Sequence, residues 1–226
     1  VFMNVIEAIK KRNSIRGFKT EPVASGVIES ILETAVYAPS ALNSQPWEFT
    51  VVAGEVLENI CRENIENLRS GQSGGPEHTT GLWPKDSVFR QRQVGLAKQL
   101  FSLMGIERED KEKRQQWLER GFRFFDAPAA VIISTDRVLG ESGPLLDIGA
   151  VMQNICLAAL EHGLGTCIED QGVYYPEVIR KYTGIDESKN IIIAIAVGYP
   201  DPEFPANRVD SGRVPVSENT TWLGFS

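Results

Sequence analysis

Apolar residues recur at helical spacing in two segments near the start of the chain. Residues 5–11 carry apolar side chains at positions 5, 6 and 9 and predict a short helix that ends near Lys11. Residues 28, 31, 32, 35 and 36 follow a helical period, with Ser25 as the predicted N-cap. Pro39 ends this second helix, because the residue before a proline disfavours the helical conformation.

Longer apolar runs follow in the rest of the chain. They predict strands over residues 48–53, 129–135 and 191–198. Residues 147–160 are apolar on almost every side and predict a helix buried all round, which glycines at 163 and 165 terminate. From residue 199 the chain is proline-rich but still apolar, and we expect it to pack along another surface. Helices on a mixed sheet without a regular βαβ repeat predict an α+β fold.

The middle of the chain differs in composition from both flanks. Residues 70–81 are rich in Gly and Ser, and a charged segment follows over 86–123. Apolar elements then resume at Ala129 without a new composition, so we expect a single domain, residues 1–226, with an insertion at about 61–125.

Within this insertion, residues 108–120 alternate charges with apolar positions, as an amphipathic lid helix would. For Phe124 and Phe125 we favour packing of the insertion onto the core over a place in the lid. The pattern leaves three aromatic residues undecided between these roles: Trp83, Phe101 and Trp117.

Charge and composition exclude several classes of function. The chain has 226 residues and a net charge of −7, so its field repels the phosphate backbone of nucleic acid. Two histidines and three cysteines argue against a histidine-rich metal site and a disulfide scaffold. No apolar run reaches the roughly 20 residues of a membrane span. An odd number of cysteines without a recognisable secretion signal predicts a cytoplasmic protein.

The familiar catalytic motifs are either incomplete in this chain or lie outside the secondary structure that they require. Residues 71–75 match G-x-S-x-G but lie in a polar loop, whereas a nucleophile elbow needs a strand before it and a helix after it. Residues 163–168 lack the third glycine of a dinucleotide fingerprint, and no phosphate-binding P-loop occurs. His162 precedes a glycine and is better placed to cap a helix. The chain therefore carries no self-sufficient set of catalytic side chains.

Two polar segments remain. Residues 10–16 (KKRNSIR) concentrate four cations, and guanidinium groups beside a hydroxyl suit a phosphate monoester. A solvated basic helix end explains the same spacing equally well. Residues 38–47 (APSALNSQPW) form a rigid polar loop that can present amide and hydroxyl groups to a planar ligand. An ordinary helix-to-strand connection accounts for the prolines but not equally well for Asn43 and Gln45.

Taken together, these segments resemble the flavin-dependent nitroreductase family. The likeness runs from about residue 5 to residue 215 and is divergent over 61–125. Its matching pieces stand in the family's order: RNSIRGF at 12–18, APS at 38–40, NSQPW at 43–47, DIG at 147–149, QN at 153–154, LAA at 157–159, GLGT at 163–166, VGYP at 197–200 and SGRVP at 211–215.

The resemblance implies a three-layer α+β fold with a central, mainly antiparallel mixed sheet flanked by helices. It also implies a homodimer with two FMN sites built from both subunits and a C-terminal extension that lies on the partner. Residues 147–160 would form much of the dimer interface.

By that likeness, the basic segment binds the FMN phosphate and ribityl chain. The implied cofactor-binding residues fall in three groups: Arg12, Asn13, Ser14 and Arg16 with Arg213 at the phosphate; Pro39, Ser40 and Asn43 from the other subunit; and Cys167, Ile168 and Glu169 beside the reactive edge of the flavin. Related sequences carry proline or threonine where this chain has Cys167, and we expect that cysteine to be a small buried hydrophobe.

The implied activity is that of an FMN-dependent oxidoreductase using NAD(P)H to reduce nitroaromatic, quinone or similar small acceptors. FMN N5 would carry the hydride, so no catalytic side chain and no metal is required. Donor and acceptor would share one site, which predicts ping-pong kinetics. Two alternatives stay open: the same fold used for reductive dehalogenation or activated-alkene reduction, and a flavin-binding protein without turnover.

Overall fold

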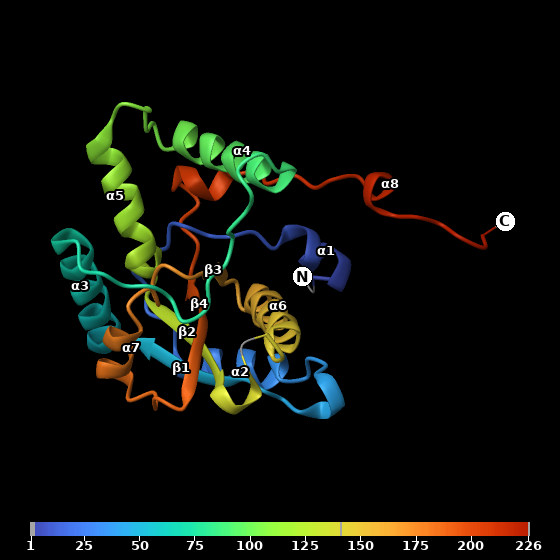
Figure 1. Cartoon of the computed structure of the whole chain (residues 1–226), viewed down its shortest axis with the longest axis horizontal. Coiled ribbons are helices and arrows are strands. Elements are labelled where there is room, and N and C mark those ends of the chain that lie inside the picture. Colours follow the sequence, from blue (N-terminus) through green and yellow to red (C-terminus); the bar gives the residue numbers. More distant parts are fainter. Residues whose placement is uncertain (1–2, 141, 226) are drawn as a thin grey trace.

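A four-stranded sheet lies between two layers of helices (Figure 1). The computed structural model describes residues 3–140 and 142–225. The strands are β1 (Glu48–Ala53), β2 (Ala129–Asp136), β3 (Gly165–Glu169) and β4 (Lys189–Gly198). They follow the order β1-β2-β4-β3, and each of the three pairings is antiparallel. An isolated parallel bridge joins Ser14 to Thr166 at the β3 edge, so the sheet is mainly antiparallel, as expected.

Eight α-helices occur in the described part of the chain. Their bounds are α1 (Val5–Lys11), α2 (Ser25–Ala35), α3 (Gly54–Ser70), α4 (Val88–Leu103), α5 (Lys111–Phe122), α6 (Leu145–Glu161), α7 (Pro176–Thr183) and α8 (Val216–Asn219). None of these helices is long and apolar enough to cross a lipid bilayer.

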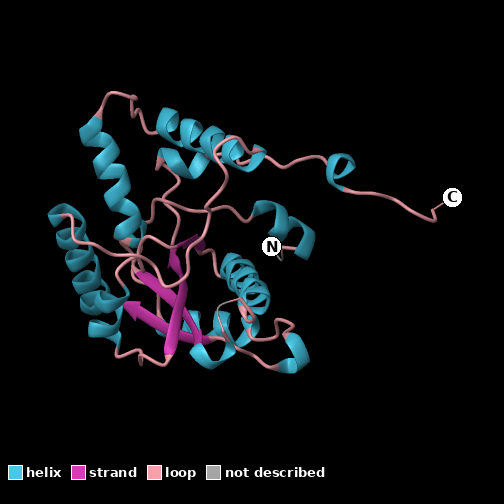
Figure 2. Ribbon diagram, in the orientation of Figure 1, coloured by secondary structure: helices cyan, strands magenta, loops and turns pink. Residues whose placement is uncertain are grey.

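The two faces of the sheet are covered by different helices. On β2, Val131 and Ile133 join a buried cluster with α2 and α6, whereas Ala130 and Ile132 join a second cluster with α3 and α7. Successive strand residues point to opposite faces, so a strand covered on both sides needs apolar residues at every position. This explains the unbroken apolar run of β2 and the three-layer α+β architecture (Figure 2).

The second predicted helix differs at both ends. Ala24, not Ser25, occupies the N-cap position, and Ser25 is the first helical residue. The helix ends at Ala35, three residues before the position that precedes the proline. Its last turn tightens into i→i+3 hydrogen bonds, with the Ala38 amide donating to the Ala35 carbonyl at 3.0 Å. The restriction imposed by Pro39 therefore reaches back by about a turn.

The prediction that residues 147–160 are buried all round is wrong for the single chain. One side of α6 packs on the sheet through residues such as Val151 and Ile155, which are fully buried. The other side is partly open, because residues such as Met152 and Leu157 are only half-buried in this chain. An apolar pattern reports that a surface is buried, but it does not say whether the covering atoms belong to the same chain.

Two irregular segments behave differently. The Gly/Ser-rich loop is anchored by Glu77, whose carboxylate accepts hydrogen bonds from Arg180 Nη2 at 2.8 Å and from the Ile191 amide at 2.7 Å. The C-terminal segment that carries α8 instead projects away from the body of the molecule (Figure 1). Trp222 and Leu223 are exposed there, so the surface on which we expected this segment to pack is not provided by this chain.

The aromatic residues before β2 pack as favoured. Phe124 and Phe125 are buried in the cluster formed with α3 and α7. Trp117 on α5 is partly buried, with its ring centroid 6.4 Å from that of Phe125. The packing interpretation is therefore confirmed for Phe124 and Phe125.

Candidate functional site

The basic segment after α1 is fastened to the edge of the sheet. Arg12 is the C-cap of α1, and the chain then runs along β3. The Ile15 amide donates to the Thr166 carbonyl at 2.9 Å, and Ser14 forms the parallel bridge with the same residue. Main-chain bonding to a strand gives the Arg12–Arg16 segment a defined course instead of the freedom of a solvated helix end.

Asn207 clamps the same segment from the C-terminal part of the chain. Its Oδ1 accepts from the amides of Arg16 at 2.7 Å and Gly17 at 3.2 Å, and its Nδ2 donates to the Gly17 carbonyl at 2.8 Å. A Cβ on Gly17 would lie 2.0 Å from Cγ of Phe204, so only glycine allows this close approach. No local spacing in the sequence marks Asn207, because its partner Gly17 is 190 residues away.

Arg120 on α5 holds the segment from a third direction. Its Nη2 donates to the Arg16 carbonyl at 2.9 Å, and its Nη1 pairs with Asp126 at 2.6 Å. The guanidinium lies 4.5 Å from the ring centroid of Phe204. Burial lowers the pKa of Arg120 from its ordinary value, the neighbouring Asp126 opposing this effect. Nothing in the charge pattern of α5 distinguishes Arg120 from its neighbours, so the sequence alone does not reveal this role.

A cavity of about 540 Å³ lies beside the clamped segment. Residues 9–13 line one side and residues 209–213 the other, so Arg12, Asn13 and Arg213 lie around one cavity. Within residues 3–140 and 142–225, Arg12 and Arg213 form no ion pair with a carboxylate. Lys10 and Lys11 add two more cations to the lining, against one carboxylate, that of Asp210. A cavity with this excess of cations suits a phosphate group.

Asn13 and Arg16 have side-chain contacts of their own. Asn13 Nδ2 donates to the Val209 carbonyl at 3.2 Å, and its Oδ1 accepts from the Ser14 amide at 2.9 Å. Asn13 therefore joins the two walls of the cavity. Arg16 Nη1 donates to the Ser14 carbonyl at 3.3 Å, which leaves the remaining donors of its guanidinium available to a ligand.

The second group of predicted residues lies on the loop before β1. Pro39 and Asn43 are exposed, and Ser40 is half-buried. The Ala41 amide donates to Asp147 Oδ2 at 3.1 Å, which ties the loop to the first turn of α6. Asn43 has φ of 60°, in the left-handed region where asparagine is among the tolerated residues.

The basic segment and the loop at 39–43 lie toward opposite ends of α6. Asp147 stands in its first turn, whereas Thr166, which binds the basic segment, comes just after its last residue. A helix of 17 residues is about 25 Å long at 1.5 Å per residue. This chain alone therefore does not bring the loop at 39–43 to the cavity lined by Arg12 and Arg213.

The third group lies at the end of β3. Cys167 is 2% exposed, and burial raises the pKa of its thiol to about 12, so it is a neutral buried side chain, as predicted. Ile168 points to the opposite face of the sheet and packs against the α2–α6 cluster. Burial raises the pKa of Glu169 to about 8. Its Oε2 accepts from the Gly172 amide at 2.7 Å, while no described residue hydrogen-bonds to Oε1.

Comparison with known proteins places this geometry in context. A nitrobenzene nitroreductase of Ectopseudomonas oleovorans is 33% identical over 218 residues, which is 96% of each chain. A chloronitrobenzene nitroreductase of Comamonas testosteroni is 32% identical over the same share of both chains. The solved structure of NfnB, an FMN and NADPH-dependent nitroreductase from sphigopyxis sp. strain HMH, is 30% identical with a TM-score of 0.92. That alignment covers 98% of this chain and 100% of that chain.

The match extends to the family as a whole. The model of the nitroreductase family aligns with residues 9–199, a range that contains the basic segment, the loop at 39–43 and β3. It therefore includes most of the residues that the sequence had marked as candidates. On this evidence, the chain belongs to the nitroreductase family.

Proposed function

We propose that this protein is an FMN-dependent oxidoreductase that uses NAD(P)H to reduce nitroaromatic, quinone or similar small acceptors. The observation that carries this proposal is the cavity lined by Arg12 and Arg213, whose cations have no carboxylate partners in the described chain. A phosphate monoester would satisfy them. The names of the two curated relatives, a nitrobenzene and a chloronitrobenzene nitroreductase, support nitroaromatic compounds as acceptors.

The basic segment and residue 213 have separable roles in this proposal, although Ser14 and Arg16 follow the lining residues 9–13 without lining the cavity themselves. Arg12, Arg16 and Arg213 would bind the phosphate, and the Ser14 hydroxyl would reach the ribityl chain. Asn13, Asn207 and Arg120 would keep these donors in place through the contacts described above.

When bound, FMN supplies the two-electron redox chemistry that no side chain of this protein supplies. The end of β3, residues 167–169, would form the wall beside the reactive edge of its ring. With a pKa of about 8, the Glu169 carboxyl is mostly protonated at pH 7. It therefore adds little negative charge at a site that must accept a hydride.

We also propose that the site is completed by a second copy of the chain. Pro39, Ser40 and Asn43 would come from that copy, because α6 separates them from the cavity by its own length. The open side of α6 and the projecting C-terminal segment carry exposed apolar residues that a second copy would cover.

Residues at about 61–125 would form an insertion beside the completed site. A cytoplasmic location would keep the three cysteines reduced.

The central experiment is the absorption spectrum of the purified protein under anaerobic conditions. We expect flavin bands that NADPH or NADH bleaches and that nitrobenzene then restores, with parallel lines in the double-reciprocal plots of a ping-pong reaction. A quinone, an enone and a halophenol serve as competing acceptors. A bleached spectrum that the enone or the halophenol restores but nitrobenzene does not would contradict the proposed acceptor class. A yellow protein that NAD(P)H leaves unchanged would contradict turnover.

Sharing of the site between two copies has its own test. One variant carries Arg12→Ala and Arg16→Ala, and the other carries Ser40→Ala and Asn43→Ala. We expect each homodimer to bind FMN weakly and co-expressed heterodimers to recover one intact site of the two. Heterodimers that bind FMN no better than the parent variants would show that the two groups do not meet across subunits.

A further inference from the structure

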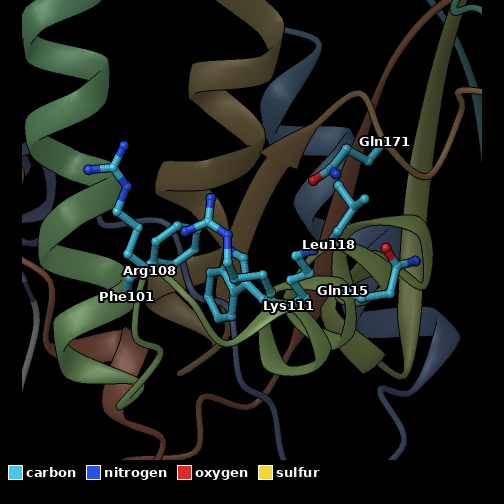
Figure 3. Close-up of a pocket in the computed structure, with 8 residues that line it drawn as sticks. Phe101, Arg108, Lys111, Gln115, Leu118 and Gln171 are labelled. Carbon is cyan, nitrogen blue, oxygen red and sulfur yellow. The ribbon is translucent and has the colours of Figure 1, made fainter.

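A second cationic cavity lies within the insertion, away from the one assigned to the flavin phosphate. It has a volume of about 600 Å³ and lies between the end of α4, the start of α5 and the loop after β3 (Figure 3). Its lining comprises Phe101, Arg108, Lys111, Arg114, Gln115, Trp117, Leu118 and Gln171. Three of these residues are cations and none is a carboxylate.

None of the three cations forms an ion pair with a described carboxylate. Within residues 3–140 and 142–225, no ion pair involves Arg108, Lys111 or Arg114. The neighbouring carboxylate of Asp110 instead caps α5 by accepting from the Lys113 amide at 2.9 Å and pairs with the Lys113 side chain. Although residues 107–114 carry as many acidic as basic side chains, only basic ones line the cavity, so an anion placed there would contact positive charge alone.

The cavity also has aromatic walls. The Arg114 guanidinium lies 4.7 Å from the ring centroid of Phe101, a cation–π contact that leaves its N–H groups able to donate. Trp117 lines the same cavity. A planar ring beside an anionic group is therefore the ligand that these walls complement.

Gln171 connects this cavity to the end of β3. It stands on the side opposite Phe101 and Arg108 in Figure 3. Its side chain packs on α5 so closely that a Cβ on Gly121 would lie 1.9 Å from its Oε1. Only one residue lies between Gln171 and Glu169, so their Cα atoms are at most about 7 Å apart.

We propose that this cavity binds an anionic group attached to a planar ring, carried by a substrate whose reacting end lies at the flavin. Its location beside the reacting end rests on the proposed function, because that function places the end of β3 at the flavin edge. Two substrates of the proposed reaction offer this chemistry: the 2′-phosphoadenosine part of NADPH, and an aromatic acceptor with a carboxylate. Arg108, Lys111 and Arg114 would then determine preference between donors or between acceptors.

Binding can be measured on the flavin-loaded protein without turnover. The probes are 2′-AMP compared with adenosine, and benzoate compared with benzamide, each titrated against tryptophan fluorescence. A Trp117→Phe variant assigns the signal to the cavity. We expect at least one anion to bind more tightly than its neutral counterpart, 2′-AMP indicating the donor and benzoate the acceptor as the source. If neither anion binds more tightly, the proposal is overturned.

Arg114→Gln provides the second measurement, with Lys98→Gln as its matched control. Lys98 is an exposed cation on α4 that does not line the cavity. Arg114→Gln should weaken anion binding by about three- to tenfold, a modest effect because the side chain is exposed to solvent. Lys98→Gln should leave it unchanged, and Arg108→Gln should repeat the loss independently.

Kinetics separate this proposal from the proposed function. If 2′-AMP is the better probe, Arg114→Gln should raise KM for NADPH and leave KM for NADH unchanged. If benzoate is the better probe, it should raise KM for nitrobenzoate and leave that for nitrobenzene unchanged. Equal losses in Arg114→Gln and Lys98→Gln would overturn the cavity assignment. Absence of turnover with intact anion binding would instead count against the oxidoreductase.

Discussion

The two ends of α6 carry different halves of one candidate site, and they are built in different ways. After its C-terminal end, the basic segment is hydrogen-bonded to β3. Asn207 accepts a hydrogen bond from the Arg16 amide, and Arg120 donates one to the Arg16 carbonyl. At its N-terminal end, the loop at 39–43 is exposed and is tied to the helix through the single hydrogen bond that Asp147 accepts.

This difference indicates which half is ready before a ligand arrives. The fold already orders the hydrogen-bond donors of the clamped half. Binding of an anion there therefore requires little further loss of conformational freedom. The exposed half has hydrogen bonds within its own turn but only the Asp147 bond to α6 among the described residues, and in the proposed dimer a second copy would cover it. Four substitutions, given in order of decreasing effect, test whether the two ends differ in this way.

The largest effect is expected from removing the charges at the clamped end. Arg12→Ala combined with Arg16→Ala should weaken FMN binding more than a hundredfold, because each charge-assisted hydrogen bond contributes about 1.5–3 kcal/mol. The return of flavin fluorescence on dilution measures the dissociation constant. Arg92→Ala combined with Lys98→Ala removes the same charge from α4 and should have little effect. Unchanged occupancy in the first variant at submicromolar concentration would contradict the assignment.

The next effect concerns the buried carboxyl of Glu169 at the end of β3. The folded protein keeps its proton up to about pH 8, whereas the ordinary pKa of a glutamate is 4.5. The folded state therefore binds more protons between these values, and the free energy of unfolding falls as the pH rises from about 4.5 to about 8.

Glu169→Gln should remove this decline. The variant should match the parent protein near pH 5 and be more stable near pH 8, by on the order of 3 kcal/mol. Urea unfolding at several pH values measures the difference, with Glu161→Gln, an exposed carboxyl at the end of α6, as the control. A difference that does not change with pH would refute the buried, protonated carboxyl.

Gly17→Ala tests the close packing of the clamped end. The new methyl group would overlap the ring of Phe204, and overpacking of this kind costs about 1–3 kcal/mol. Gly26→Ala on α2 is the matched control, because nothing lies within 4 Å of its Cβ position. Thermal unfolding should show a lower Tm for Gly17→Ala alone, and equal Tm values for the two variants would contradict the packing argument.

The smallest effect is expected at the exposed end. Asp147→Ala removes the acceptor of the Ala41 amide and should cost about 1 kcal/mol of local stability. Hydrogen exchange over residues 39–45 should become faster, while exchange over residues 12–18 should not change. Asp147→Asn keeps an acceptor oxygen and should restore most of the protection. Faster exchange at both ends would mean that the two halves are not independent.

Much of the fold could be predicted from local patterns. Three of the strands and the helix near 147–160 were found because each buries a face whose period is visible in a short window of sequence. The helix at 5–11 was found from the same apolar spacing, although its apolar side chains are exposed in this chain. The errors have physical causes as well. Ser25 does not cap its helix, because the structure begins that helix one residue earlier than the cap preference suggests. The apolar surface of α6 was assigned to burial within one chain, which a pattern cannot distinguish from burial by another.

The residues of the candidate site also divide into those that the sequence could name and those that it could not. Arg12, Asn13 and Arg213 could be named from the resemblance, and the structure brings them to one cavity. Asn207 and Arg120 could not, because their partners lie 190 and 104 residues away and neither residue stands in a recognisable motif. Contacts over such distances depend on how the elements pack, and packing leaves no local period in the sequence.

By itself, the sequence determined the family and the mainly antiparallel α+β fold, and it named the candidate site residues. These depend on local periodicity and on motifs whose residues stand in a recognisable order. Only the tertiary structure decided which residues hold the basic segment, that α6 separates the two halves of the site, and that free cations gather between α4 and α5. Each of these follows from the distance between elements in space, which is set by the burial of side chains far apart along the chain.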